Sequence, residues 1–338
     1  MTSVPSGRRP TVRDVAKEAG VSVATVSRVL AGAPKFVVGE TRIKVMDAAR
    51  RLGYATNMAA KSLATGKNGT VGVVVPDLGN QYFTTIVQAV VHAARDDGFH
   101  VLVGDTLDAA EAEPQVARQT LTRSDGLIVC SPRSAELDLA EMLDVGKPTV
   151  LVNRRLDGVE GVSSVVTDTL DTTGRLVDHL LGHGHRAIAF VGANADSKQN
   201  NARWALIERQ TAEAGAVSWR VPLGHAEADH SRVLEPLLEQ GCTAIMAAND
   251  LQAAVVYNAA AQLNLRVPDD LSVVGFDDTP IARWLRPRLT TATMHEHAVG
   301  EAAWSAMRTL LADPTQVTHS TFSADAVLRD SVADAPRR

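Results

Sequence analysis

The chain is poor in cysteine: among its 338 residues only Cys130 and Cys242 carry a thiol. Each lies in or at the end of an apolar run, so we expect both to be buried small hydrophobic side chains in a reducing cytoplasm. A disulfide between them is the weaker alternative.

Long hydrophobic runs are also lacking. No stretch approaches the roughly 18 uninterrupted apolar residues of a transmembrane helix, and the first ten residues, MTSVPSGRRP, lack the apolar run of a signal peptide. We therefore expect a cytoplasmic protein without a membrane partner. Hydrophobic residues still make up 45% of the chain, which is ample for globular packing, and the length predicts two or three cores.

Motifs of catalysis and metal binding are lacking too. His179, His183 and His185 have no carboxylate or cysteine pattern around them, and His295-Glu296-His297 lacks the two-residue gap of a zinc-protease helix. Gly182-His183-Gly184 is no dinucleotide fingerprint, and neither a phosphate-binding loop nor a Ser/His/Asp arrangement stands out. We expect no enzyme activity, no catalytic residue, no metal and no cofactor.

Charge is distributed unevenly. The whole chain has a formal charge of −5, but its first 68 residues hold twelve Lys and Arg against four acidic residues, a charge of +8. The remaining residues therefore carry −13. This asymmetry predicts a basic module, suited to phosphates, on an acidic body.

The basic segment has the pattern of three short helices. Thr11 can cap the first helix and Gly20 can end it, and Ser22 can cap the second. The third spans roughly 41–52. The first two helices have the dimensions of a helix-turn-helix motif, whose second helix enters a major groove. We expect their common core to consist of Val12, Val15, Ala16, Ala19, Val26, Val29, Leu30, Ile43, Val45, Met46, Ala49 and Leu52.

From residue 71 short apolar runs alternate with longer amphipathic stretches, which predicts an α/β fold of parallel sheets covered on both faces. We expect four strands to complete one sheet near residue 160 and the later strands to form a second. Ligand space would lie between these doubly wound subdomains, at the carboxyl ends of the strands. The expected strands are 71–75, 100–104, 126–130, 149–152, 187–191, 243–247 and 271–275, and the expected helices 82–96, 111–123, 136–145, 170–181, 201–214, 229–239, 249–262 and 296–311.

Residues 11–30, TVRDVAKEAGVSVATVSRVL, closely resemble the LacI/GalR family of bacterial transcription regulators, and the match continues through 40–42, 53–54 and 57–63. The body resembles the family's periplasmic-binding-protein-like core at 71–80, 125–128, 179–190, 248–250, 267–278 and 289–291. The resemblance implies a disordered tail (1–10), a helix-turn-helix domain (11–56), a hinge helix with linker (57–69), an effector-binding and dimerisation domain (70–330) and a second tail (331–338).

The resemblance also implies roles in DNA binding. Val23 and Ala24 occupy two base-reading positions and Arg28 a third. The first two can offer only apolar contacts, for example to a thymine methyl, whereas Arg28 can make two hydrogen bonds to a guanine edge. Phosphate contacts are expected from Thr25, Ser27, Lys35 and Tyr54. The alternative for Thr25 and Ser27 is an ordinary solvated helix face.

The family's hinge segment folds when two protomers pair on operator DNA, and its Leu is wedged into the minor groove. Asn57, Ala60 and Leu63 match this segment, with Leu63 as the wedge that kinks the duplex and Ala60 as a small neighbour that permits close approach. Thr56 stands where the family usually has Pro, so the start of the hinge is expected to be less stiff. A plain linker is the alternative.

Effector contacts are implied after the predicted strands. Tyr82 and Phe83 match a position where the family places an aromatic residue against the ligand, and Asn153, where the family more often has Asp, precedes Arg154. The polar residues that hold an effector's hydroxyls or carboxylate align with Arg203, Asn249 and Asp277. Taken singly, Asp277 could cap a helix and Arg203 could be a surface charge.

Two departures leave the effector's identity open. Leu206 stands where the family has Gly in Arg-x-x-Gly, and an aromatic that often flanks the sugar is missing near Ala226.

The leading hypothesis is a ligand-responsive repressor of sugar or carbohydrate metabolism genes. It would bind a palindromic operator as a homodimer, with an effector, a sugar or sugar derivative, controlling whether the hinges order. The chain ends without a heptad repeat, so no tetramerising coil is expected. A solute-binding sensor of the sugar-binding type is the alternative; it would share the body but not need the basic segment.

Overall fold

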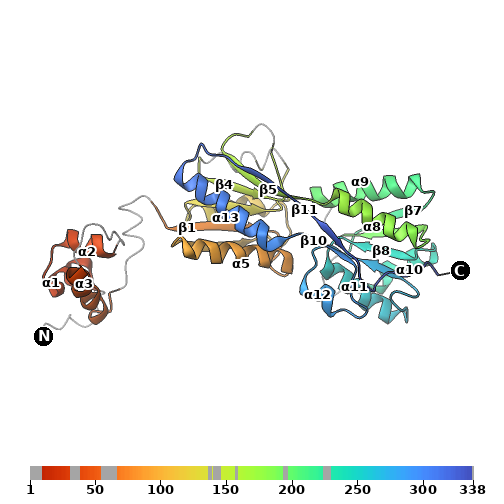
Figure 1. Ribbon diagram of the computed structural model, residues 1–338, viewed down its shortest axis with the longest axis horizontal. Coiled ribbons are helices and arrows are strands. Elements are labelled where there is room, and N and C mark those ends of the chain that lie inside the picture. Colours follow the sequence, from red (N-terminus) through yellow and green to blue (C-terminus); the bar gives the residue numbers. More distant parts are fainter. Residues whose placement is uncertain are drawn as a thin grey trace. The chain divides into compact units, whose positions relative to one another are not determined.

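The structure, a computed structural model, describes residues 10–30, 39–54, 67–135, 139, 146–156, 159–192, 197–223 and 230–336. The chain divides into two compact units, Met1–Asn68 and Gly69–Arg338, which are described separately (Figure 1). The second unit begins one residue before the predicted start of the body at residue 70.

The first unit contains three helices in its described part: α1 (Val12–Ala19), α2 (Val23–Leu30) and α3 (Gly39–Arg51). The backbone N–H and the hydroxyl of Thr11 both donate to Asp14 Oδ2, at 2.8 and 2.7 Å, and this capping fixes the start of α1. Gly20 ends α1 in the left-handed conformation, with φ of 65°. The predicted boundaries of α1 and the turn into α2 are therefore confirmed.

The core of this unit differs from the prediction on α3. Ile43 and Met46, which we placed in the core, are 63% and 43% exposed, whereas Ala48 is fully buried. The inner face of α3 consists of Val45, Ala48 and Ala49, at i, i+3 and i+4. The prediction was wrong because it chose the larger side chains and passed over the alanine at the helical spacing.

The second unit begins with a six-stranded parallel sheet in the order β11-β5-β4-β3-β1-β2. Helices α5 (Gln81–Asp96) and α13 (Glu296–Ala312) cover one face, and α6 (Glu113–Leu121) covers the other. The strands are β1 (Thr70–Val75), β2 (His100–Asp105), β3 (Gly126–Cys130), β4 (Thr149–Val152), β5 (Val162–Asp168) and β11 (His319–Ser323).

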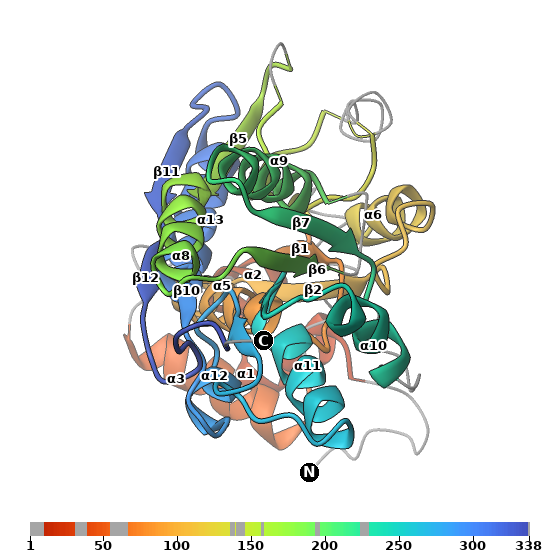
Figure 2. The same ribbon diagram turned by 90° about the vertical axis from the view of Figure 1, so that its right-hand side faces the viewer.

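A four-stranded parallel sheet in the order β7-β6-β8-β9 forms the second subdomain (Figure 2). Helices α8 (Leu170–Gly182) and α9 (Lys198–Glu213) pack on one face, and α10 (Ser231–Glu239) and α11 (Asp250–Gln262) on the other. Its strands are β6 (Ala187–Val191), β7 (Val217–Val221), β8 (Ala244–Ala247) and β9 (Ser272–Val274). The predicted pair of doubly wound subdomains is confirmed.

The chain passes between the subdomains more often than predicted. It crosses from β5 to α8, returns from β10 (Thr291–Thr293) to α13, and crosses again from β11 to β12 (Asp325–Val327). Strands β10 and β12 pair antiparallel. The expectation that everything after about residue 160 forms the second subdomain is therefore wrong, since α13 and β11 belong to the first.

Several elements were missing from the prediction because they lack a continuous apolar run. β5 contains Ser163, Ser164 and Thr167, the edge strand β7 is mostly half-buried, and the edge strand β11 is largely exposed. The five-residue helix α12 (Pro280–Trp284) was also missed. The predicted helix 136–145 lies outside the described residues except for Leu139.

The predicted C-terminal tail also differs from the structure. Ser331 is fully buried, and the residues after it bond to the second subdomain. Ala333 N–H donates to Ser272 Oγ, and Ala335 N–H donates to the carbonyl of His183. Residues 331–336 are therefore part of the fold.

Both cysteines are buried and free, as predicted, and burial raises the pKa of Cys130 to about 12. Across the described residues, the helices are too short or too polar to pass through a lipid bilayer.

A candidate DNA-reading helix and a candidate effector cleft

Helix α2 presents the predicted base-reading residues to solvent. Val23 is 45% exposed, and Ala24, Ser27 and Arg28 are exposed as well, while Val26 and Val29 hold the opposite face in the core. Exposing the apolar side chains of Val23 and Ala24 to water is unfavourable, and contact with DNA would cover them. This arrangement therefore leaves α2 free to lie in a groove.

Thr25 is half-buried and contributes to the cap of α2. Its backbone N–H donates to Ser22 Oγ at 3.1 Å, and the two hydroxyls are 2.8 Å apart. Tyr54 is also half-buried against the core of the first unit, where its N–H donates to the carbonyl of Ala49. Both have a structural role beside the phosphate contact predicted for them. The other predicted DNA contacts, Lys35, Asn57, Ala60 and Leu63, lie outside the described residues.

In the described part of this unit, the ion pairs involve residues other than Arg28. Lys44 pairs with Glu40, Arg50 with Asp47, and Arg51 with Glu18. Among the described residues, these pairs lie on or against α3 rather than on the open face of α2, so the guanidinium of Arg28 remains available to DNA.

In the second unit a polar cleft lies between the two subdomains. Residues that follow β1 and β3 line one side, and residues that follow β6, β8 and β9 line the other. This is the carboxyl-end position that the strand pattern predicted. Its lining comprises Asn80, Tyr82, Phe83, Ser131, Arg133, Ser197, Gln199, Asn200, Arg203, Ala248, Asn249, Asp277 and Met294.

Arg203 lies in this cleft and is only 3% exposed. Its Nε donates to Thr169 Oγ1 at 3.2 Å, and its Nη1 donates to the carbonyl of Ala248 at 3.1 Å. The guanidinium carbon lies 4.0 Å from the centre of the Phe276 ring. Burial lowers the pKa of Arg203, and the negative charge of Asp277 opposes that shift. The packing fixes the direction of the guanidinium rather than leaving it a surface charge.

Asp277 is the acidic group of the cleft. It is 6% exposed, and burial, followed by the nearby charge of Asp250, raises its pKa well above the ordinary value. Its φ of 108° is rare for a residue with a side chain. The cap of α12 is Thr279, so Asp277 does not cap a helix.

Two asparagines in the lining cap helices with their side-chain oxygens. Asn80 accepts from Tyr82 N–H, and Asn249 accepts from Gln252 N–H at 2.8 Å. What Asn249 can offer a ligand is therefore its NH₂ group.

Asn153 and Arg154 are buried but are not among the lining residues of the cleft. The side-chain NH₂ of Asn153 donates to the Tyr82 hydroxyl at 2.7 Å and to Ser131 Oγ at 2.9 Å. Both acceptors line the cleft. In the structure Asn153 orients these two hydroxyls from behind.

The cation of Arg133 was not predicted. Its Nε donates to Asp108 Oδ1 at 2.7 Å, and its backbone N–H donates to the buried carboxylate of Glu113. Ser131 and Arg133 directly follow the predicted strand 126–130, so the carboxyl-end rule would have found them. Asn80, Ser197, Gln199, Asn200, Ala248 and Met294 are the other lining residues that sequence reasoning missed.

The histidines near the end of α8 serve the fold. Buried His185 hydrogen-bonds Thr243 Oγ1 and the carbonyl of Ala333, and burial lowers its pKa to about 4. His183 hydrogen-bonds Asp334. In the described parts of the chain, no three His, Cys, Asp or Glu side chains are arranged to hold a metal ion.

Two regions of the chain match known protein families. The family model for bacterial regulatory proteins of the lacI family matches residues 11–57, and the model for a periplasmic binding protein-like domain matches residues 177–332. The chain is 35% identical to the HTH-type transcriptional regulator GalS of Salmonella typhimurium over 337 residues, 96% of either chain. It is 31% identical to catabolite control protein A of Priestia megaterium, over 87% of this chain and 90% of that one.

A solved structure supports the same relationship. The lac repressor dimer bound to operator and the anti-inducer ONPF aligns with a TM-score of 0.81 and 26% identity, over 96% of this chain and 100% of that one. These relatives are regulators rather than enzymes.

Proposed function

The chain belongs to the LacI family of bacterial regulatory proteins and is a DNA-binding transcription regulator; on that premise, we propose that it represses carbohydrate-metabolism genes in the cytoplasm as an effector-controlled homodimer. One observation carries the proposal. The same chain has a helix with an exposed face that could contact bases and a polar cleft between two subdomains.

The lining of the cleft favours a polyhydroxylated ligand. Arg203 and the amide of Asn249 can donate hydrogen bonds, and Asp277 can accept them when ionised. Tyr82 and Phe83 add an aromatic wall, with their rings 5.1 Å apart in an edge-to-face pair. Mixed donors and acceptors beside an aromatic face suit the hydroxyls and the C–H face of a sugar. The solved relative, by its description, binds an anti-inducer together with operator.

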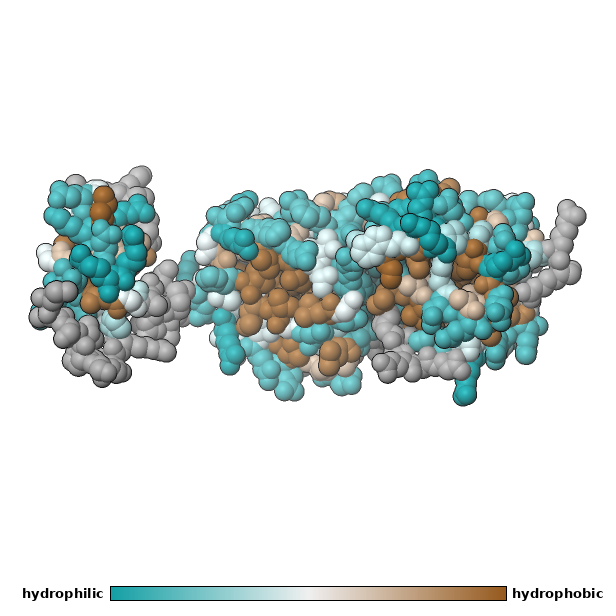
Figure 3. Space-filling model, turned by 90° about the horizontal axis from the view of Figure 1, so that it is seen from below, coloured by the Kyte–Doolittle hydropathy of each residue, from teal (hydrophilic) through white to brown (hydrophobic). Residues whose placement is uncertain are grey.

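A homodimer is supported by an exposed apolar face on the second unit. Helix α5 lies at the lower edge of the first subdomain in Figure 1. Figure 3 views the molecule from that lower side and shows hydrophobic residues gathered there. The core of this subdomain is edged by half-buried Val91, Phe99 and Val101. In the second subdomain, α12 exposes 71% of Trp284. A second copy of the chain is the partner that would cover this face, since a symmetric operator calls for a two-fold dimer.

Control would arise from different effector affinities of two arrangements of the subdomains. Three crossing segments join the subdomains, so a ligand that contacts both sides of the cleft biases their relative angle. In a dimer this angle sets the separation of the two points where the hinges begin. The effector would then shift the population in which residues 57–63 pair on DNA.

Two measurements test the proposal. Binding of the purified chain to DNA from its own promoter region should fall steeply as salt rises, because the basic first unit would release counterions from phosphates. A shuffled DNA of equal length is the control. A screen of thermal unfolding against D-galactose, D-glucose, D-ribose and cellobiose should reveal at least one stabilising sugar. Equal affinity for promoter and shuffled DNA would refute the regulatory role, and a flat sugar screen would count against the effector class.

A further inference from the structure

The backbone next to Asp277 is held in an unfavourable conformation. Asp277 and Asp278 have φ values of 108° and 54°, both in the region that favours glycine. Such a conformation is costly for a residue with a side chain and persists only where its surroundings hold it firmly. The contacts that hold this turn therefore decide where the side chain of Asp277 points.

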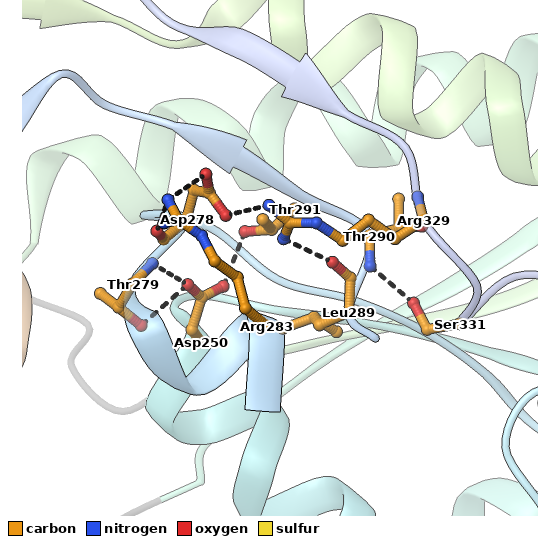
Figure 4. Close-up of polar contacts among 9 residues, drawn as sticks. All are labelled: Asp250, Asp278, Thr279, Arg283, Leu289, Thr290, Thr291, Arg329 and Ser331. Carbon is orange, nitrogen blue, oxygen red and sulfur yellow. Dashed lines mark hydrogen bonds and ion pairs between the residues drawn. The ribbon is translucent and has the colours of Figure 1, made fainter. Parts of the chain in front are cut away.

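Part of the turn is fixed by neighbouring strands. Asp277 N–H donates to the carbonyl of Ala292 at 2.8 Å, and Asp277 forms an isolated parallel β-bridge with Thr293 of β10. Just after the turn, the fully buried carboxylate of Asp250 accepts from Thr279 N–H at 2.7 Å and from Thr279 Oγ1 at 3.0 Å. Asp250 also accepts from Thr291 Oγ1 at 2.6 Å, which ties β10 to the same carboxylate (Figure 4).

The side chain of Asp278 is held by two arginines. Nη2 of Arg329 donates to its Oδ1, and Nη2 of Arg283 donates to its Oδ2 at 3.0 Å. The Arg329 and Asp278 side chains are only 12% and 11% exposed, so this pair is shielded from water as surface ion pairs are not. Figure 4 shows Arg329 and Arg283 reaching Asp278 from different segments of the chain.

Arg329 itself is anchored at several points. Its Nη1 donates to the carbonyl of Leu289 at 3.0 Å, and its N–H donates to Thr290 Oγ1 at 2.9 Å. Thr290 N–H in turn donates to Ser331 Oγ, whose hydroxyl donates to the carbonyl of Val273. The segment after β12 is thereby fixed to β9, and this holds the backbone from which the Arg329 side chain reaches Asp278.

We propose that Arg329 is a positioning residue of the effector cleft: by holding Asp278 it keeps the strained turn in place and so aims the Asp277 carboxyl group at the ligand. This inference rests on the proposed function of the cleft. Arg329 does not line the cleft and would act only through the turn. Because Arg329 follows β12, a crossing strand, it also links the path between the subdomains to the ligand-facing carboxyl group.

The test uses the full-length chain with Arg329→Gln, Arg329→Lys and Asp278→Asn. Arg288→Gln is the matched control, because Arg288 pairs with Asp330 in the same segment, through side chains that are 57% and 54% exposed. Ligand-free crystal structures give the first readout. We expect Asp277 and Asp278 to leave the positive-φ region in Arg329→Gln and in Asp278→Asn and to keep it in Arg288→Gln. If Arg329→Gln does not fold, the nearly isosteric Asp278→Asn decides.

Calorimetric titration with D-galactose, D-ribose and cellobiose gives the second readout. The tightest-bound sugar should lose about tenfold or more in affinity with Arg329→Gln, the loss of one well-placed hydrogen bond to a charged group. Arg329→Lys should recover part of the lost affinity, and Arg288→Gln should bind the sugar as tightly as wild type. An unchanged turn in Arg329→Gln, or an equal loss of affinity in Arg288→Gln, overturns the proposal. If wild type binds none of these sugars, the result counts against the proposed sugar effector. The conformation of the turn in the crystal structures still tests the role of Arg329.

Discussion

The packing of α13 against α5 makes the sign of one substitution predictable. A Cβ atom added at Gly300 would lie 2.7 Å from both the carbonyl oxygen of Ile86 and the Cβ of Ala89. Carbon atoms pack at about 3.5–4.0 Å, so the two helices would have to separate by roughly 1 Å. Neither neighbour can rotate away, since one is backbone and the other is a Cβ. Gly300→Ala therefore opens the core between α13 and the middle of α5.

The magnitude follows from two opposing effects. Alanine in place of glycine within a helix gains about 1 kcal/mol, whereas overpacking a close contact costs about 1–3 kcal/mol. Because neither contact can move aside, we take a cost near the upper end, about 3 kcal/mol, and after the gain of about 1 kcal/mol we expect Gly300→Ala to lose roughly 2 kcal/mol. Gly174 of α8 is the matched control, because its Cβ would meet only Gln210 Oε1 at 3.4 Å and Leu206 Cδ2 at 3.9 Å.

Differential scanning calorimetry of the full chain distinguishes the two variants. Gly300→Ala should lower the melting temperature by about 4 °C, and Gly174→Ala should raise it by about 2 °C. A Gly300→Ala protein as stable as wild type would refute the close approach of α13 and α5. A Gly174→Ala protein destabilised to the same degree would show that the loss does not depend on this contact.

Three further predictions concern helix α2, the turn and the proposed dimer face. Arg28→Ala should relax operator preference at one base pair in a binding-site selection, while a uniform loss on all sequences would demote Arg28 to a phosphate contact. Burial raises the pKa of Asp250 to about 7, so the folded state binds more protons than the unfolded chain. The free energy of unfolding should therefore fall as pH rises from about 4 to about 7. Asp250→Asn should flatten this pH dependence in urea titrations, and an unaltered slope would contradict the assignment. Trp284→Ala should weaken the dimer about tenfold or more in analytical ultracentrifugation, whereas Leu107→Ala, which truncates a side chain that is 80% exposed, should leave it intact, and equal effects would remove Trp284 from the interface.

The fold was largely predictable because its buried strands are continuous apolar runs. The run at 126–130 coincides with β3, and the one at 187–191 with β6. Local pattern cannot show which sheet a late segment joins, because that depends on contacts distant in sequence. The return of α13 and β11 to the first subdomain was missed for this reason. The polar edge strands were missed because half of their surface faces water.

The candidate site was predictable where the chain keeps the family's pattern. Tyr82, Phe83, Arg203, Asn249 and Asp277 all line the cleft. The residues that support them were not visible in the sequence. Arg329 lies 51 positions after Asp278 and gives no local signal. Only the folded chain brings these two side chains together.

The coupling between the cleft and the DNA-binding first unit is tested most directly by operator affinity, measured by fluorescence anisotropy with and without the sugar that most stabilises the protein. The account predicts that saturating sugar changes the affinity for promoter DNA by at least about fivefold, and that operator changes the affinity for the sugar by the same factor. Identical operator affinity in both conditions, with the sugar demonstrably bound, would contradict it.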